Sequence, residues 1–117
     1  MAQPKRSIEL SEIIREMRET NKRISDTAAE MYKQGTLLSH AERNYKVALH
    51  HKILELKTAG YPATLILELA KGDEKIAGLR FERDLAKSRL DTAKEGARSL
   101  RAIQSTYQTI SKYQDEL

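Results

Sequence analysis

A seven-residue apolar repeat limits the folds open to this chain, because it runs through most of the sequence. In the first half, one line of seam positions reads Leu10, Met17, Ile24, Met31, Leu38 and Tyr45. A second line, four residues further on, reads Ile14, Asn21, Ala28, Gly35, Glu42, Leu49 and Leu56. Apolar residues that alternate at intervals of three and four are typical of helices packed along coiled-coil seams. The sequence therefore predicts long helices.

The last third of the chain carries a similar stripe, which predicts one helix over residues 74–114. Its apolar positions are Ile76, Leu79, Ala86, Leu90, Ala93, Ala97, Leu100, Ile103, Tyr107 and Ile110. Such a helix is about 60 Å long, at about 1.5 Å per residue. A compact globule of this size cannot bury a stripe of that length. We expect the helix to fold back against residues 8–58, to pair with another chain, or both.

Glycine and proline mark the remaining boundaries. The strongest stop is residues 59–62, where Gly60 suits a left-handed helix end and Pro62 suits the first turn of a new helix. Gly35 either breaks the first long helix or leaves it continuous. We expect helices at about 8–33, 37–58, 62–71 and 74–114, with 62–71 as a buried elbow. The fold class is all-α: a single domain over 1–117, formed by a long antiparallel helical hairpin or coiled-coil-like bundle that dimerises.

Composition excludes several classes of protein. The chain has no cysteine, so it offers no disulfide and no thiolate for catalysis or metal binding. It has no apolar run of about eighteen residues, and the polar sequence after Met1 does not resemble a signal peptide. We expect a cytoplasmic protein with no membrane contact.

No arrangement typical of catalysis is found in the sequence. The three histidines are His40, His50 and His51, and adjacent helix positions do not share a face. The glycines are isolated, so no phosphate-binding loop is formed. We expect no catalytic residue, no metal site and no cofactor, and therefore no enzyme.

Basic residues concentrate near the end of the chain. Residues 75–101 hold eight basic and four acidic side chains, an excess that equals the net charge of the whole protein, +4. Six of these cations are spaced so as to lie along one face of a helix: Arg80, Arg83, Lys87, Lys94, Arg98 and Arg101. They are the candidate site for a nucleic acid or an acidic protein surface. The alternative is that their methylene stems only flank the apolar seam.

Several segments together resemble small helical proteins encoded by phages and prophages of Gram-positive bacteria. The resemblance covers roughly residues 40–107 and is carried by residues 45–49, 53–57, 60–66, 70–73 and 79–86. It implies an accessory phage function in the host cytoplasm. That function is either work beside replication and recombination proteins or inhibition of a host or defence protein, such as a CRISPR nuclease. It assigns a role to no individual residue.

Three hypotheses follow from these observations. The first is a dimeric accessory protein that binds a host or defence macromolecule, either a protein or a protein–nucleic-acid complex. The second is a DNA- or RNA-binding factor that uses the six cations, and the third is an assembly scaffold. The seam also suggests that Asn21 weakens helix pairing, in which case Asn21→Leu should raise thermal stability and broaden the distribution of oligomers.

Overall fold

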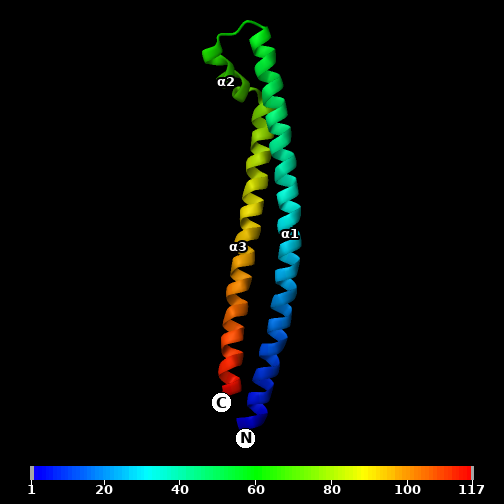
Figure 1. The fold of residues 1–117 in the computed structure, drawn as a ribbon, viewed down its shortest axis with the longest axis vertical. Helices are drawn as coiled ribbons and strands as arrows, with labels where there is room; N and C mark the ends of the chain where they lie inside the picture. The colour runs from blue at the N-terminus through cyan, green and yellow to red at the C-terminus, as the bar shows by residue number, and fades with distance from the viewer. Residues whose placement is uncertain (1, 117) are drawn as a thin grey trace. The chain divides into compact units, whose positions relative to one another are not determined.

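The fold is all-α, as the sequence predicts. The computed structural model describes the backbone of residues 2–116 and the side chains of residues 9–114. Three helices make up this part of the chain (Figure 1): α1 at Ala2–Thr58, α2 at Ala63–Gly72 and α3 at Glu74–Glu116. The described residues contain no strand. The expected hairpin is present, since α1 and α3 run in opposite directions and are joined through α2.

Helix α1 continues through Gly35, so the possible break at residues 34–36 does not occur. A glycine inside a helix costs about 1 kcal/mol relative to alanine, whereas ending the helix would also require a new nucleation step. Nearby hydroxyls remain compatible with the helix because they donate to carbonyls four residues earlier. Thr36 Oγ1 donates to Tyr32 O and Ser39 Oγ donates to Gly35 O.

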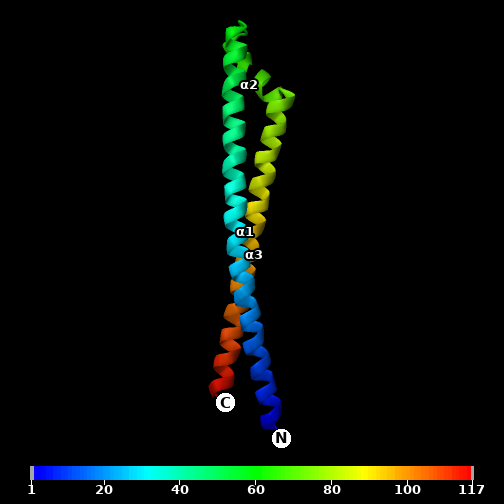
Figure 2. The ribbon, with the colours of Figure 1, turned by 90° about the vertical axis from the view of Figure 1, so that its right-hand side faces the viewer.

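The chain packs as two units, and α1 and α3 contribute to both. The terminal unit comprises Met1–Met31 and Thr92–Leu117, and the elbow unit comprises Tyr32–Asp91. The elbow unit therefore contains all of α2, together with the end of α1 and the start of α3 (Figure 2).

In the terminal unit, one predicted line of the seam is confirmed and the other is wrong. Leu10, Met17, Ile24 and Met31 are half-buried, as expected. However, Ile14, Asn21 and Ala28 are exposed. The second line instead lies three residues after the first, where the buried or half-buried positions are Ile13, Thr20 and Thr27. This side of the seam is therefore more polar than the apolar pattern suggested.

The stripe on α3 shows a similar shift near its end. Ala97 and Leu100 are buried as predicted, and Tyr107 is half-buried, but Ile103 and Ile110 are exposed. The neighbouring Gln104 is buried in their place, with only 8% of its surface exposed. The seam then continues through Ser111 and Gln114, which are half-buried. From Ala93 to Gln114, the buried and half-buried positions thus follow one another at intervals of three and four residues. Several of these positions are polar.

Hydrogen bonds explain why Gln104 can be buried. Its Nε2 donates to Asn21 Oδ1 at 2.7 Å and to the backbone carbonyl of Met17 at 3.3 Å. Asn21 itself lies on the exposed edge of the seam. The amide oxygen of Gln104 has no hydrogen-bond partner. Asn21 is therefore a partner of a buried group and not a weak seam residue.

In the elbow unit, the seam is formed around one aromatic residue. Tyr45 from α1 is buried, as are Ile76 and Ala86 from α3. Leu38 and Leu79 are half-buried beside them. Tyr45 and Leu38 belong to the first of the two seam lines that the sequence predicts on α1.

The turn after α1 has the predicted glycine cap. Gly60 has φ 89°, a left-handed conformation that glycine adopts without a Cβ penalty. The amide of Tyr61 donates to Leu56 O at 3.2 Å, and that of Gly60 donates to Lys57 O at 3.1 Å. This pair of bonds is the Schellman motif, which satisfies carbonyls at the end of a helix. Pro62 then forms the N-cap of α2.

The expectation that 62–71 is a buried elbow is wrong for most of α2. Only Ile66 and Ala70 are buried. Leu65, Leu67 and Leu69 are exposed. The reason is geometric. A helix of ten residues that lies against two others has only one side buried by them, and its other sides stay exposed.

The Gln104 contacts reverse the expectation for Asn21→Leu. The substitution removes the acceptor of a buried amide, so we expect it to lower the free energy of unfolding by about 1–2 kcal/mol. The double variant Asn21→Leu/Gln104→Leu removes the donor too and should recover most of the loss. Urea unfolding of the two variants and the wild type measures both effects. A single variant more stable than the wild type would contradict the importance of this bond.

Gly35 and Gly60 differ in backbone conformation, so the same substitution by alanine should have opposite effects at the two sites. A Cβ at either Gly35 or Gly60 meets nothing within 4 Å, so neither substitution creates a clash. Gly35→Ala should raise the free energy of unfolding by about 0.5–1 kcal/mol, because the site is helical. Gly60→Ala should lower it by about 1 kcal/mol or more, because φ is positive. Thermal melts followed by circular dichroism should show shifts of opposite sign.

Candidate functional site

The six predicted cations lie on α3, but they do not form one continuous exposed row. Arg80, Lys87, Lys94 and Arg101 are all exposed and follow one another at intervals of seven residues. Seven residues are close to two helical turns, so Arg80 and Lys87 share one edge of α3 within the elbow unit, and Lys94 and Arg101 share one edge within the terminal unit. We call them the basic row. No carboxylate among the described residues forms an ion pair with any of them.

Arg83 is instead part of the seam. Its guanidinium carbon lies 4.6 Å from the centroid of the Tyr45 ring. Its Nη2 also lies 2.9 Å from Asp84 Oδ1. A cation over an aromatic face contributes about 0.5–1 kcal/mol at an exposed site and more when it loses water. The prediction that Arg83 shares the exposed face is therefore wrong, and its charge is already used within the elbow unit.

Arg98 is exposed, but its guanidinium forms an ion pair with Glu95 one turn earlier on the same helix. Such exposed pairs contribute only a few tenths of a kcal/mol, so a partner molecule could replace Glu95 at little cost. Arg98 therefore lies beside the basic row as a weakly paired cation. The sequence spacing alone does not distinguish it from the four unpaired residues.

Lys94 and Arg101, the two members of the basic row in the terminal unit, form no ion pair with a carboxylate of the described residues. On α1, Asn21 is exposed at the edge of the seam and accepts a hydrogen bond from Gln104. The residues one heptad before and after Asn21 are Ile14 and Ala28. In coiled coils such flanking positions often carry acids that pair with cations on the other helix. Ile14, Asn21 and Ala28 are not acidic.

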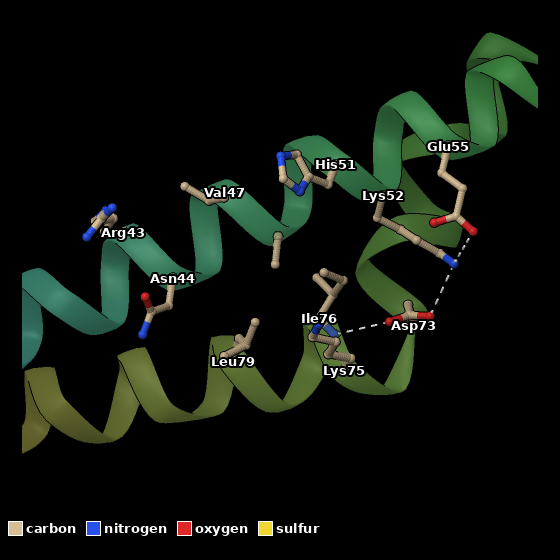
Figure 3. Close-up of a pocket in the computed structure, with 11 residues that line it drawn as sticks. Arg43, Asn44, Val47, His51, Lys52, Glu55, Asp73, Lys75, Ile76 and Leu79 are labelled. Carbon is tan, nitrogen blue, oxygen red and sulfur yellow. Dashed lines mark hydrogen bonds and ion pairs between the residues drawn. The ribbon is translucent and has the colours of Figure 1, made fainter.

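A hollow of about 610 Å³ lies in the elbow unit between α1 and the start of α3 (Figure 3). Its apolar lining comes from Val47, Ala48, Ile76 and Leu79. Its charged and polar lining comes from Arg43, Asn44, His51, Lys52, Glu55, Asp73 and Lys75. Sequence reasoning did not group these residues, because they come from separate helices and follow no motif.

Lys52 and Asp73 join α1 to the start of α3 at one end of this hollow. Lys52 Nζ lies 3.5 Å from Asp73 Oδ1 and 3.6 Å from Glu55 Oε1. The other carboxylate oxygen of Asp73 accepts from the Ile76 amide at 3.3 Å, so Asp73 caps the N-terminus of α3. That amide, and then the Lys52 ammonium, hold the pKa of Asp73 below its ordinary value. The charge of Lys52 is therefore balanced internally.

A second hollow, of about 330 Å³, lies in the terminal unit and is acidic. Glu9, Glu12 and Glu16 line it from α1, together with Ile13 from the seam. Tyr107 and Gln114 line it from α3.

Among the described residues, no group of three or more His, Asp or Glu side chains is arranged to hold a metal ion. Likewise, no helix in the described part of the chain is both long and apolar enough to cross a membrane.

Comparison with known proteins adds no relative. No family model matches the sequence, and neither a curated protein nor a solved structure matches it.

Replacing Asp73 should separate its two roles. Asp73→Asn retains a capping oxygen but loses the charge that Lys52 contacts, whereas Asp73→Ala loses both. Because the folded pKa is lowered, the ionised carboxyl stabilises the fold above its ordinary pKa, and this stabilisation is lost as pH falls through the folded value. The melting temperature of Asp73→Asn should thus lie below that of the wild type at about pH 7.

The same difference should shrink as the pH falls below the ordinary Asp pKa of 3.8, and it should disappear below the lowered pKa of folded Asp73, where the carboxyl is protonated in both states. The additional loss in Asp73→Ala should persist there, since it reflects the missing cap. Melting curves of the three proteins across this pH range test both statements. An Asn variant that differs from the wild type by the same amount at all pH values would contradict the role of the charge.

Proposed function

We propose that this protein is a non-catalytic binding protein that docks on an anionic macromolecule through the basic row of α3. The observation that carries the proposal is the set of four exposed cations, Arg80, Lys87, Lys94 and Arg101, that no carboxylate of the described chain neutralises. Cations with no partner in the protein are free to pair with phosphates or acidic side chains of another molecule. Arg98 adds a fifth contact if Glu95 releases it.

The resemblance of residues 40–107 to phage and prophage proteins supports a biological setting for this binding. In that setting the protein is an accessory factor in the host cytoplasm, and its target is a host or defence macromolecule. A nuclease complex that holds nucleic acid, such as a CRISPR nuclease, offers the phosphates that the basic row requires. Binding there would inhibit the complex by blocking access to its nucleic acid.

Direct binding to DNA or RNA is a second candidate, favoured by the even spacing of the row. Within each unit the two cations of the row are about 10 Å apart along α3: Arg80 and Lys87 in the elbow unit, and Lys94 and Arg101 in the terminal unit. A regular line of positive charge suits a regular line of phosphates better than it suits most protein surfaces. Affinity of this kind falls with salt in proportion to the number of phosphates neutralised.

Fluorescence anisotropy with labelled single-stranded and duplex DNA tests the second candidate. Four cations predict a slope of about −3 to −4 for the logarithm of the binding constant against that of salt concentration. Lys87→Gln/Lys94→Gln should reduce the slope by about 2 and weaken binding at low salt. Arg15→Gln/Lys22→Gln removes two exposed cations from α1 and should change neither.

The outcomes separate the two candidates. Equal loss in both double variants would show that net charge, and not the basic row, drives binding. If the wild type fails to bind nucleic acid even at low salt, direct binding is excluded. Capture of a host or defence complex by the wild type, but not by the Lys87/Lys94 variant, would then support the first candidate. Equal capture by both would reject the basic row as the docking surface.

A further inference from the structure

The hollow between α1 and the start of α3 lies wholly within the elbow unit (Figure 3). Its volume of about 610 Å³ falls within the range of pockets that bind small molecules, about 300–1,000 Å³. Among the described residues its lining comes from α1, Asp73 and the start of α3, and none comes from α2. Val47, which lines it, is 47% exposed. The hollow is therefore open to solvent, and a ligand can reach it without a change in the fold.

The two ends of the hollow differ in charge (Figure 3). At one end the carboxylates of Glu55 and Asp73 both pair with Lys52. At the other end lie Arg43 and Asn44, and no carboxylate is found among the described residues that line this end. Arg43 forms no ion pair with any carboxylate of the described residues. A negatively charged group is therefore better placed at the Arg43 end than beside Glu55 and Asp73.

An apolar surface separates these two ends. It is formed by Val47 and Ala48 from α1 and by Ile76 and Leu79 from α3. A ligand with an apolar body would cover these side chains and remove them from water, which is favourable. The hollow thus combines a cationic end, an apolar middle and a far end where the charges are already paired.

The charges of the lining also indicate how many negative charges the ligand carries. With His51 counted as neutral, Arg43, Lys52 and Lys75 face two carboxylates, which leaves an excess of one positive charge. A single anionic group would balance this excess. The guanidinium of Arg43 suits a carboxylate, because its planar fork can donate two parallel hydrogen bonds. The side-chain amide of Asn44 offers a further donor at the same end.

We propose that this hollow binds a small amphipathic monoanion, an apolar molecule that carries one carboxylate. The carboxylate pairs with Arg43 and Asn44, and the apolar body lies over Val47 and Ile76 towards the end that the Lys52 ion pairs close. This proposal is independent of the proposed function, because no described residue of the basic row lines the hollow. Failure of nucleic-acid or protein binding would therefore leave it unaffected.

Displacement of a fluorescent anion measures the binding and its requirement for a negative charge. Anilinonaphthalene sulfonate is an aromatic monoanion whose emission rises on apolar surfaces, and it should bind the wild type. Decanoate should displace it. Decanol has an apolar chain of the same length without the charge, and decylamine reverses the charge. Both should compete about tenfold less well than decanoate or worse, because neither can accept the charge-assisted hydrogen bonds of Arg43.

Substitutions of two exposed cations on α1 form the matched comparison. Arg43→Gln should weaken decanoate binding about tenfold, because it removes the charge at that end of the hollow. Arg43→Lys keeps the charge but loses the planar fork, so it should weaken binding less. Lys46→Gln removes an exposed cation of the same helix that does not line the hollow, and it should bind decanoate as the wild type does. Circular dichroism should show that all three variants keep their helical content.

Amide chemical shifts locate the ligand without any variant. Decanoate titrated into the isotope-labelled wild type should shift the amides of Val47, Ala48 and Ile76. The amides of Leu65 and Leu69, two exposed leucines of α2 outside the hollow, should change little.

Three results would overturn the proposal. The first is a failure of decanoate to compete, or equal competition by decanol, since no recognition of the anion would remain. The second is equal weakening by Arg43→Gln and Lys46→Gln, which would assign binding to net charge. The third is a set of shifts centred on α2, which would place the ligand on its exposed leucines and not in the hollow.

Discussion

The limited depth of a two-helix seam governs the rest of this structure. Two helices can bury only the narrow stripes that face each other, and no large side chain in the described part of the chain is fully buried. The apolar residues that are buried are few, and three of them, Ala70, Ala86 and Ala97, are alanines. Stability therefore depends on many shallow contacts distributed along α1 and α3. No single cluster replaces a globular core.

A shallow apolar seam has a problem of register, because sliding one helix by a heptad brings similar residues together again. Specific polar contacts remove this ambiguity. Gln104 reaches Asn21 and the Met17 carbonyl in the terminal unit, and Lys52 reaches Asp73 in the elbow unit. Either pair would be lost by a slide of one heptad. Polar residues in the seam thus cost some stability and specify one alignment within each unit.

The sequence predicts where the helices lie along the chain better than it predicts which of their side chains are buried in the seam. The seven-residue repeat, Gly60 and Pro62 locate the helices, because each acts through local backbone geometry. The choice between Ile103 and Gln104 is different, since neighbouring positions differ by about 100° around a helix. Hydrophobicity favours Ile103, but Gln104 is buried because Asn21 lies opposite it, 83 positions away. Arg83 was misplaced for the same reason, as its position depends on Tyr45.

The basic row differs from the other cations beside the seam because its side chains have no ion-pair partner among the described residues. Cations beside a seam are commonly neutralised by acids of the facing helix, and their charges then contribute to pairing. In the elbow unit Lys52 pairs with Asp73, and Arg83 lies over the ring of Tyr45. Lys94 and Arg101 instead form no ion pair with a carboxylate of the described residues. The ion pairs of the described chain therefore do not account for their charge, and an anionic partner is the explanation that we propose.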